Sequence, residues 1–389
     1  MKRVFFVQNG DFAEAFAAFA RGEAETYRDQ KRSVDYVNRL ALENEVSTLT
    51  LGTQRHEVEL ARNLFAYGLP REDCDRAAVR HLFNRIRPSH LVLRTPHRVF
   101  LQEAAKRDTF VLPVFADLFS GRGCRARYNH LRLRHALLNC SIPCISNHSL
   151  NASNSVVSAL GVKPDLVVPW DWRRVPVEDH PKRCVKDRQS PTLFFAGALL
   201  KEKGIGDCLS AVARLRRSGL DWRFTVAGHD GDDTWRRRAD ALGISNAVTF
   251  LGRVPNARVR QEMRAHDFVI VPSHHSYPEG LPNTIYEALA SRSVLVISDH
   301  PAFAGRLKPD RDCLVFLAGE EAALADCLTR AAQTPALYER ISENAREAHD
   351  SLYVGMEWTA LIDRFLQDPG DVTGWVKANA LSRLERSSA

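Results

Sequence analysis

Two glutamates eight residues apart are the side chains in this sequence best placed to hold a polar ligand. Glu279 stands in a short loop after the apolar residues 268–273, and Glu287 falls about two helical turns further on. A helix should open between them at Pro282, Asn283 and Thr284, and the unpaired backbone N–H groups of its first turn could bind an anion. Two carboxylates can accept hydrogen bonds from hydroxyl groups, and the helix start between them can bind a phosphate. This combination predicts a nucleotide sugar as the ligand.

A second group of residues could hold the diphosphate of such a ligand. Gly197 directly follows the predicted strand Thr192–Ala196 and allows a tight turn, and Lys203 stands at the mouth of the next helix. The competing interpretation of these residues is an ordinary strand–helix loop with a surface lysine. For Glu279 and Glu287 the competing interpretation is an acidic helix start in which Glu287 forms a surface ion pair. Both alternatives stay open at this point.

The elements that must position these residues alternate between strand and helix along the whole chain. This alternation predicts an α/β protein with two doubly wound parallel sheets, in domains of residues 1–170 and 191–352. Residues 171–190 interrupt the pattern with charges and prolines and are expected to be a linker. Residues 56–67 are expected to form a helix. Ligands of open α/β sheets bind outside the carboxyl ends of the strands, and every motif named above lies in such a loop.

Composition excludes several classes of protein. The 389 residues are 44% hydrophobic and carry a net charge of +7, which is ordinary for a globular protein. The eight cysteines form no CxxC zinc pattern, and no apolar run approaches the roughly 20 residues of a membrane span. The chain starts directly on a strand without a signal peptide, so we expect a cytoplasmic protein. Few aromatic residues accompany the basic ones, so nucleic-acid binding is not expected.

A basic, acid-free stretch suggests an anionic partner for one face of the first domain. It runs from Leu118 to Pro164 and includes Arg127, Arg132 and Arg134 on a predicted helix. Peripheral contact with an anionic membrane or an acidic glycan is one interpretation, and a solvated helix face is the other. The sequence leaves the oligomeric state unknown.

Taken together, these motifs resemble those of the retaining glycosyltransferases of GT-B fold in family 4, the glycosyl transferases group 1. The resemblance covers residues 191–350 and rests on three segments: Gly197 to Gly204, Phe250-Leu-Gly-Arg253, and Val271-Pro-Ser273 with Glu279-Gly280 and Glu287-Ala288. It implies two Rossmann-like domains that face each other across a cleft. The first would bind the acceptor and the second the nucleotide-sugar donor, with a C-terminal segment, residues 356–389, that packs back on the first.

The resemblance also implies a role for each matched residue. Glu279 would contact hydroxyls of the donor sugar, Lys203 would neutralise the diphosphate, and Glu287 would hold the ribose. Gly280 and Leu281 would offer N–H groups to sugar and phosphate, while Arg253 and Val254 would lie near the base.

The sequence departs from the family pattern at three places. Ala198 stands where a second cation is usual, and Lys201 is the nearest substitute. Ala116, before Asp117, stands where a histidine is common, and His97 could supply a donor instead. Only Asn9-Gly10 remains of the usual Gly-Gly loop. We therefore predict His97 and Asp117 as catalytic residues beside Glu279 and Lys203, and Asn9, Gly10 and Arg94 as acceptor-side residues.

The expected activity is transfer of a sugar from a nucleotide diphosphate to a saccharide or lipid-linked acceptor in glycan synthesis, without a cofactor or a metal. The pairs Asp230/Asp232 and Asp310/Asp312 match an Asp-x-Asp metal pattern by chance under this hypothesis. Two other hypotheses stay open: a nucleotide-sugar epimerase or hydrolase on the same fold, and a non-catalytic nucleotide-sugar binding subunit.

Overall fold

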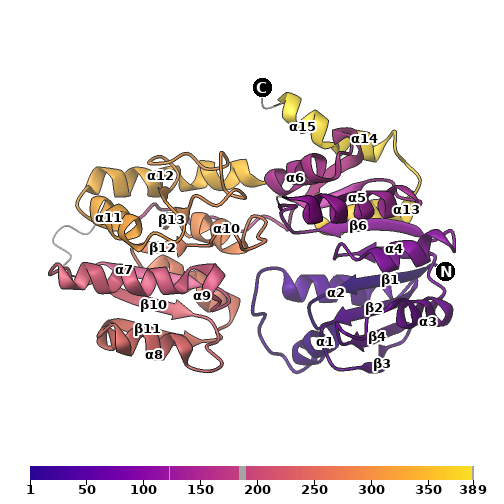
Figure 1. Ribbon diagram of the computed structural model, residues 1–389, viewed down its shortest axis with the longest axis horizontal. Coiled ribbons are helices and arrows are strands. Elements are labelled where there is room, and N and C mark those ends of the chain that lie inside the picture. Colours follow the sequence, from indigo (N-terminus) through magenta and orange to yellow (C-terminus); the bar gives the residue numbers. More distant parts are fainter. Residues whose placement is uncertain (122, 184–189, 388–389) are drawn as a thin grey trace. The chain divides into compact units, whose positions relative to one another are not determined.

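The computed structural model describes residues 1–121, 123–183 and 190–387, which form two compact units (Figure 1). Unit 1 contains residues 1–25, 29–173 and those from Val354 onward, and unit 2 contains residues 26–28 and 174–353. Residues 171–173 of the expected linker belong to unit 1 and residues 174–183 to unit 2. Residues 184–189 of that segment lie outside the described residues.

Unit 1 is built on one eight-stranded sheet in the described part of the chain. Its strands are β1 (Arg3–Gln8), β2 (Glu45–Leu51), β3 (His56–Ala61), β4 (Leu64–Leu69), β5 (His90–Leu93), β6 (Phe110–Phe115), β7 (Ile145–His148) and β8 (Val167–Trp170). The order is β3-β4-β2-β1-β5-β6-β7-β8, and all neighbouring strands are parallel except β3 and β4.

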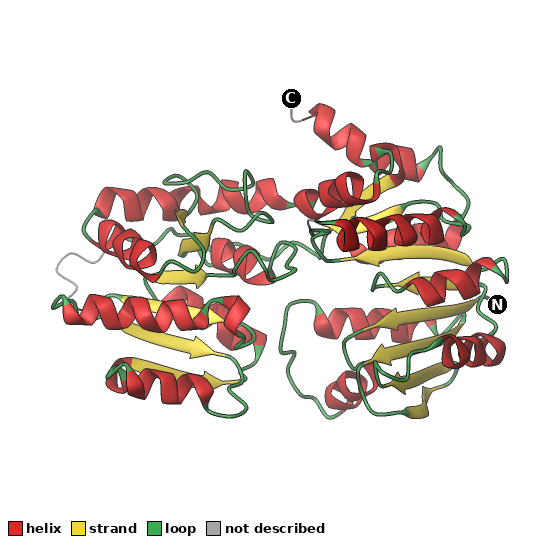
Figure 2. Cartoon of the chain, viewed as in Figure 1, coloured by secondary structure: helices red, strands yellow, loops and turns green. Residues whose placement is uncertain are grey.

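Helices cover both faces of this sheet (Figure 2), because successive side chains of each strand point to opposite faces. One face packs on α3 (Arg76–Ile86), α4 (Arg98–Ala105), α5 (Cys124–Leu138), α6 (Leu150–Leu160) and α15 (Leu381–Ser387). The other packs on α1 (Phe12–Ala20), α2 (Gln30–Leu40), α13 (Trp358–Gln367) and α14 (Trp375–Asn379). The short helix η1 (Pro164–Leu166) precedes β8.

The helix expected over residues 56–67 is wrong: these residues form the β3–β4 hairpin, with Asn63 at φ +62° in its turn. β4 pairs in parallel with β2 and so extends the sheet, while β3 closes its edge in antiparallel pairing. The exposed Glu57, Val58 and Glu59 fit an edge strand, where sheet pairing overrides helix propensity.

Unit 2 contains a six-stranded, fully parallel sheet within the described residues. The strands are β9 (Thr192–Ala196), β10 (Arg223–Ala227), β11 (Val248–Gly252), β12 (Phe268–Val271), β13 (Val294–Ser298) and β14 (Leu314–Phe316). Their order is β11-β10-β9-β12-β13-β14, so the direction of winding reverses between β9 and β12. Such a reversal is the point at which doubly wound sheets bind ligands.

The helices of unit 2 also lie on both faces of its sheet (Figure 2). One face packs on α7 (Ile205–Arg217), α8 (Thr234–Ala241), α11 (Glu321–Ala332) and the first part of α12 (Pro335–Leu352). The other packs on α9 (Asn256–Ala265), α10 (Asn283–Ala290) and the end of α12. Two short helices, η2 (Lys201–Lys203) and η3 (Ser245–Ala247), lie in connecting loops.

Candidate functional site

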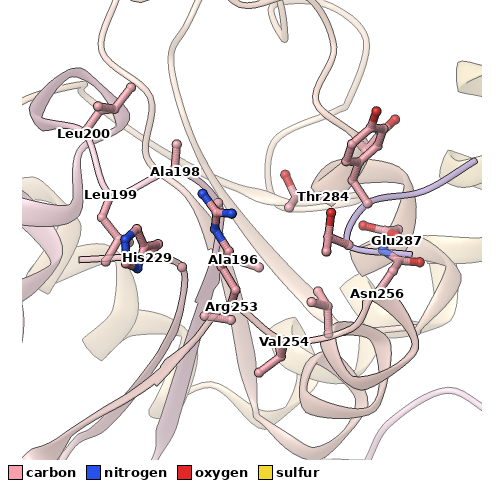
Figure 3. A pocket seen from close by; sticks show the side chains of 17 residues that line it. Ala196, Ala198, Leu199, Leu200, His229, Arg253, Val254, Asn256, Thr284 and Glu287 are labelled. Atoms are coloured by element: carbon pink, nitrogen blue, oxygen red, sulfur yellow. Dashed lines mark hydrogen bonds between the residues drawn. The ribbon is translucent and has the colours of Figure 1, made fainter. Parts of the chain in front are cut away.

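A cavity of about 470 Å³ lies at the carboxyl edge of the unit 2 sheet, beside the reversal point (Figure 3). Its size suits a small-molecule ligand. The predicted donor residues that line it are Gly197, Arg253, Val254, Asn283, Thr284 and Glu287. The other lining residues are Thr26, Tyr27, Ala196, Ala198, Leu199, Leu200, Ala227, Gly228, His229, Asn256 and Val259.

A buried carboxylate is the most specific polar group of this cavity. Glu287 in α10 is only 3% exposed, and the Nδ2 of Asn256 donates to its Oε1 at 2.6 Å. Figure 3 shows the two side chains next to each other. Because the amide fixes one oxygen, the carboxylate presents a defined acceptor for ligand hydroxyl groups. Sequence reasoning missed Asn256, since it lies 31 positions from its partner.

The other predicted glutamate belongs to a separate cluster that does not line the cavity. Glu279 is 9% exposed; the Nζ of Lys203 donates to its Oε1, and the hydroxyl of Ser273 donates to its Oε2. The same Nζ lies 4.6 Å from the ring centroid of Tyr277. Both carboxylate oxygens are thus held, and the structure brings together two residues predicted separately, Lys203 and Glu279.

Two glycines let the loops of this edge approach one another. Gly204 follows Lys203 at φ +76°, and a Cβ there would lie 2.2 Å from the carbonyl oxygen of Pro272. A Cβ on Gly228 would lie 2.3 Å from the carbonyl oxygen of Gly197. Any larger residue would push these loops apart. The loop with Lys203 can therefore approach the loop with Glu279 because Gly204 lacks a side chain.

The loop that carries Glu279 is fixed by a buried histidine. His300 is fully buried; its Nδ1 accepts from the N–H of Ala302 at 3.1 Å, and its Nε2 lies 3.0 Å from the carbonyl oxygen of Tyr277. This pattern requires the neutral tautomer with the proton on Nε2. Burial lowers the pKa of His300, in agreement with a neutral ring.

Two further histidines tie the same loop to its surroundings. The Nε2 of His274 lies 2.6 Å from a carboxylate oxygen of Asp207 in α7. The Nε2 of His275 lies 2.8 Å from a carboxylate oxygen of Asp299, after β13. The loop between β12 and α10 is therefore held at several points ahead of the glutamate.

The remaining predicted residues of unit 2 do not line the cavity. Lys201 is exposed on η2, while Gly280 and Leu281 are buried and Pro282 directly precedes α10. Leu281 packs in the apolar core, so only its backbone is available to a ligand.

The predicted residues of unit 1 gather at the carboxyl edge of its sheet. Asn9 and Gly10 follow β1, Arg94 and His97 follow β5, and Asp117 follows β6, and these three strands are neighbours. The amide oxygen of Asn9 accepts from Arg71 at 3.1 Å, and the carbonyl oxygen of Gly10 accepts from Gln8 and Thr50. Asp117 is exposed, and its carbonyl oxygen accepts from Asn147.

Arg94 is engaged by its own unit. Its guanidinium lies 5.3 Å and 5.7 Å from the rings of Trp358 and Trp172, and its Nη1 donates to Gln8 at 3.1 Å. These cation–π contacts give the side chain a packing function.

His97 precedes α4, with its ring 5.3 Å from that of Phe100. Its Nδ1 is buried and has no hydrogen-bond partner among the described residues. Burial, assisted by the charges of Arg98 and Arg71, lowers the pKa of His97. The ring is therefore neutral near pH 7 and could exchange a proton or a hydrogen bond with a ligand.

The basic helix predicted in unit 1 is α5. Arg127 and Arg132 are exposed and Arg134 is half-buried. Large apolar side chains on the same helix are also exposed: Tyr128 (58%), Leu131 (60%) and Leu138 (48%). The sequence reasoning missed this apolar component, because it considered only the charge.

The Asp-x-Asp carboxylates have structural partners. Asp230 accepts from the backbone N–H groups of Trp235 and Arg236 at the start of α8, and Asp310 pairs with both Nη atoms of Arg330. Within the described part of the chain, no three His, Cys, Asp or Glu side chains form a metal-binding group.

Residues 177–348 match the family model of the glycosyl transferases group 1. The chain is 27% identical over 157 residues to an alpha-D-kanosaminyltransferase from Streptomyces kanamyceticus, covering 40% of each protein. It is 29% identical over 162 residues to a phosphatidyl-myo-inositol mannosyltransferase from Mycobacterium leprae, covering 41% of this chain and 42% of the relative. The chain thus matches about two fifths of the length of these curated relatives.

Solved structures extend the likeness to both units. Sucrose-phosphate synthase from Thermosynechococcus elongatus superposes with a TM-score of 0.65 over 100% of both chains at 15% identity. HepE from Anabaena, solved with UDP, gives 0.64 at 15% identity, covering 95% of this chain and 99% of HepE. These likenesses, with one largely parallel and one fully parallel sheet, confirm the predicted GT-B fold class. Among the described helices, none is both long and apolar enough to cross a membrane.

Proposed function

We propose that this protein is a retaining glycosyltransferase that moves a sugar from a nucleotide diphosphate to a saccharide or lipid-linked acceptor, in the synthesis of a bacterial surface polysaccharide or another glycan. The observation that carries the proposal is the buried Glu287 carboxylate, oriented by Asn256, in a cavity at the reversal point of the unit 2 sheet. The match of residues 177–348 to a glycosyltransferase family supports it, and so do the transferase relatives.

In this proposal Glu287 binds the ribose, and positive groups bind the diphosphate. Among the described lining residues Arg253 is the one lysine or arginine, and it adds positive charge to the wall expected to hold the base. Lys203 and the start of α10 add further positive potential, and Glu279 accepts hydroxyl hydrogens of the donor sugar.

The transfer step would proceed on one face of the sugar. The leaving phosphate oxygen takes the proton of the acceptor hydroxyl as the bond from that hydroxyl oxygen to the sugar forms and the bond to the phosphate breaks. The chain contributes positioning and charge stabilisation. His97 and Asp117 of unit 1 would bind the acceptor and assist its proton transfer. Since side chains carry the stabilising charge here, transfer should persist in a chelator.

Nucleotide binding tests this proposal most directly. UDP, GDP, ADP and TDP are added in turn to the full chain, and thermal unfolding is followed. A ligand present at about 100 times its Kd stabilises by about 2.7 kcal/mol, a shift that is easily measured. The nucleotide that binds then defines the donors to assay for sugar transfer with and without EDTA. Absence of a shift with all four would refute the proposal.

Ala198 in the cavity wall favours one second candidate, a binding subunit without catalysis. It predicts nucleotide binding and no consumption of any matching nucleotide sugar, with or without acceptor. An epimerase or hydrolase would instead consume the donor when no acceptor is present.

We also propose that α5 brings the enzyme to an anionic membrane. Tyr128, Leu131 and Leu138 recur at helical spacing on the exposed face, and Arg127 and Arg132 flank them. No acidic residue interrupts this helix, and apolar side chains between arginines fit an anionic lipid surface.

Binding to lipid vesicles distinguishes a membrane-binding surface on α5 from an ordinary solvated helix. Sedimentation with vesicles of anionic and of neutral phospholipid should show binding to the anionic vesicles alone. The double change Leu131→Ser and Arg132→Glu should remove it. Binding that is equal for both proteins would refute the membrane proposal without affecting the donor site.

A further inference from the structure

A three-residue segment from early in the chain forms part of unit 2. Residues 26–28 group with this unit, although the residues on either side of them belong to unit 1. Thr26 and Tyr27 line the same cavity as Glu287. The wall of the cavity is therefore not complete with residues 174–353 alone.

Arg28 anchors this segment to the helix that carries Glu287. The side chain is only 4% exposed, and its guanidinium carbon lies 4.7 Å from the ring centroid of Tyr286 and 5.5 Å from that of Tyr353. Its Nη2 also donates to the hydroxyl of Tyr353 at 3.2 Å. Tyr286 directly precedes Glu287 in α10, so the anchor fixes the segment relative to the carboxylate.

The neighbouring Tyr27 brings an aromatic ring to the cavity. It is 48% exposed, and among the described lining residues it has the one phenol ring. The same wall includes Arg253 and Val254, the residues predicted to lie near the base. A nucleobase is flat and aromatic and stacks readily on such a ring.

We propose that Tyr27 stacks on the base of the donor nucleotide and that Arg28 is its positioning residue. This inference rests on the proposed function and extends it: the donor site includes residues from the start of the chain, outside the segment that carries the family motifs. Because stacking recognises any base by its face, Tyr27 adds affinity, whereas the groups at the edge of the base determine its identity.

The test measures two ligands by titration calorimetry with the full chain. One is the best-bound of UDP, GDP, ADP and TDP, and the other is ribose 5-diphosphate, which lacks a base. Tyr27→Ala should bind the nucleotide about tenfold or more weakly and bind ribose 5-diphosphate as wild type does. Tyr27→Phe should bind both normally, because it keeps the ring. Arg28→Ala should show a smaller loss, again confined to the nucleotide.

Leu317→Ala is the control, because Leu317 is a similarly exposed apolar side chain of unit 2 (58%) that does not line the cavity. It should leave both affinities unchanged. Unaltered nucleotide binding by Tyr27→Ala overturns the inference, and so does an equal loss for both ligands, which would indicate general damage to the cavity. If wild type binds none of the four nucleotides, the proposed function itself fails, so the two failures can be told apart.

Discussion

The carboxyl edges of the two sheets use their polar side chains differently. In unit 2, Lys203 pairs with Glu279 and Asn256 pairs with Glu287, so each carboxylate is held in place beside a loop or cavity. In unit 1, Arg94 is occupied by the indoles of two tryptophans.

This difference explains why one edge is recognisable and the other is not. The nucleotide-sugar site proposed for unit 2 would need fixed carboxylates and cations, and pairing within unit 2 holds Glu279 and Glu287 in place. At the edge of unit 1, Arg94 is engaged in packing, Asp117 is exposed, and the Nδ1 of His97 has no partner among the described residues. The four predictions below test that contrast, from the largest expected effect to the smallest.

Glu279→Gln should lower the rate of sugar transfer about a hundredfold or more, because it removes a charged group that is expected to contact the reacting sugar. The change keeps the shape of the side chain but leaves Lys203 without its counter-charge, so the melting temperature is measured beside the rate to separate lost stability from lost catalysis. Donor consumption and product formation measure the effect. The control is Glu347→Gln, an exposed glutamate that pairs with Arg311 on the surface and should leave the rate unchanged. If the Glu279→Gln variant transfers sugar at the wild-type rate, the predicted contribution of unit 2 to the transfer step through Glu279 is wrong.

Lys203→Ala should weaken nucleotide binding about tenfold to a hundredfold, the usual range for a lost charged hydrogen bond. Lys201→Ala, two residues away on the same short helix, should change it by about twofold or less, because its side chain is exposed, whereas that of Lys203 is held against Glu279. Calorimetry with the best-bound nucleotide compares them. A larger effect at Lys201 would show that Lys201 provides the cation that Ala198 lacks.

His97→Ala should raise the KM for the acceptor about tenfold, as expected for one lost hydrogen bond of about 1.5 kcal/mol, and leave nucleotide affinity unchanged. A change in the KM for the acceptor without a change in nucleotide affinity would show that His97 of unit 1 acts on the acceptor and not on the donor. Should nucleotide affinity fall instead, the assignment of His97 to the acceptor would be wrong.

Acid should destabilise unit 2 through His300. Its folded pKa lies below the ordinary value near 6.5, so the unfolded chain binds a proton that the folded chain does not. Stability is therefore lost as the pH falls through about 6.5. The midpoint of thermal unfolding should drop between pH 7.5 and 5.5, and the drop should be shallower in His300→Asn. Burial also lowers the pKa of His266 and His349, which keep part of the slope in both proteins. Identical slopes would show that His300 is not the titrating group.

The sequence was sufficient for the fold class, and several of its predicted donor residues lie together at one edge of unit 2, where their roles stay a prediction. Hydrophobic alternation indicated the strands, and short-range spacing identified Gly197, Lys203, Glu279 and Glu287 because each motif is contained in one strand–loop–helix unit. The helix expected over residues 56–67 failed because β4 pairs with β2, a segment outside this stretch, and local propensity does not report such pairing.

The partners of the predicted residues were harder to foresee. Ser273 belongs to the segment Val271-Pro-Ser273 but had no predicted role in binding. Asn256 is separated from Glu287 by a strand and a helix. Nothing local to Tyr27 indicates that it reaches the cavity, since that depends on the packing of Arg28 against α10. Contacts between distant segments are thus the part of the site that spacing cannot reveal.

The division of the chain has a consequence for the order in which the protein folds during synthesis. One core of unit 1 combines Val4 and Phe6 of β1 with Trp358 and Phe365 of α13. Helices α1 and α2 cover part of this face early, but the part that packs on α13 and α14 should stay uncovered until those helices are made. Residues 174–353 form a continuous stretch and can pack earlier. Folding of the chain should then finish with its first-made part, and chaperone contact should concentrate on nascent unit 1.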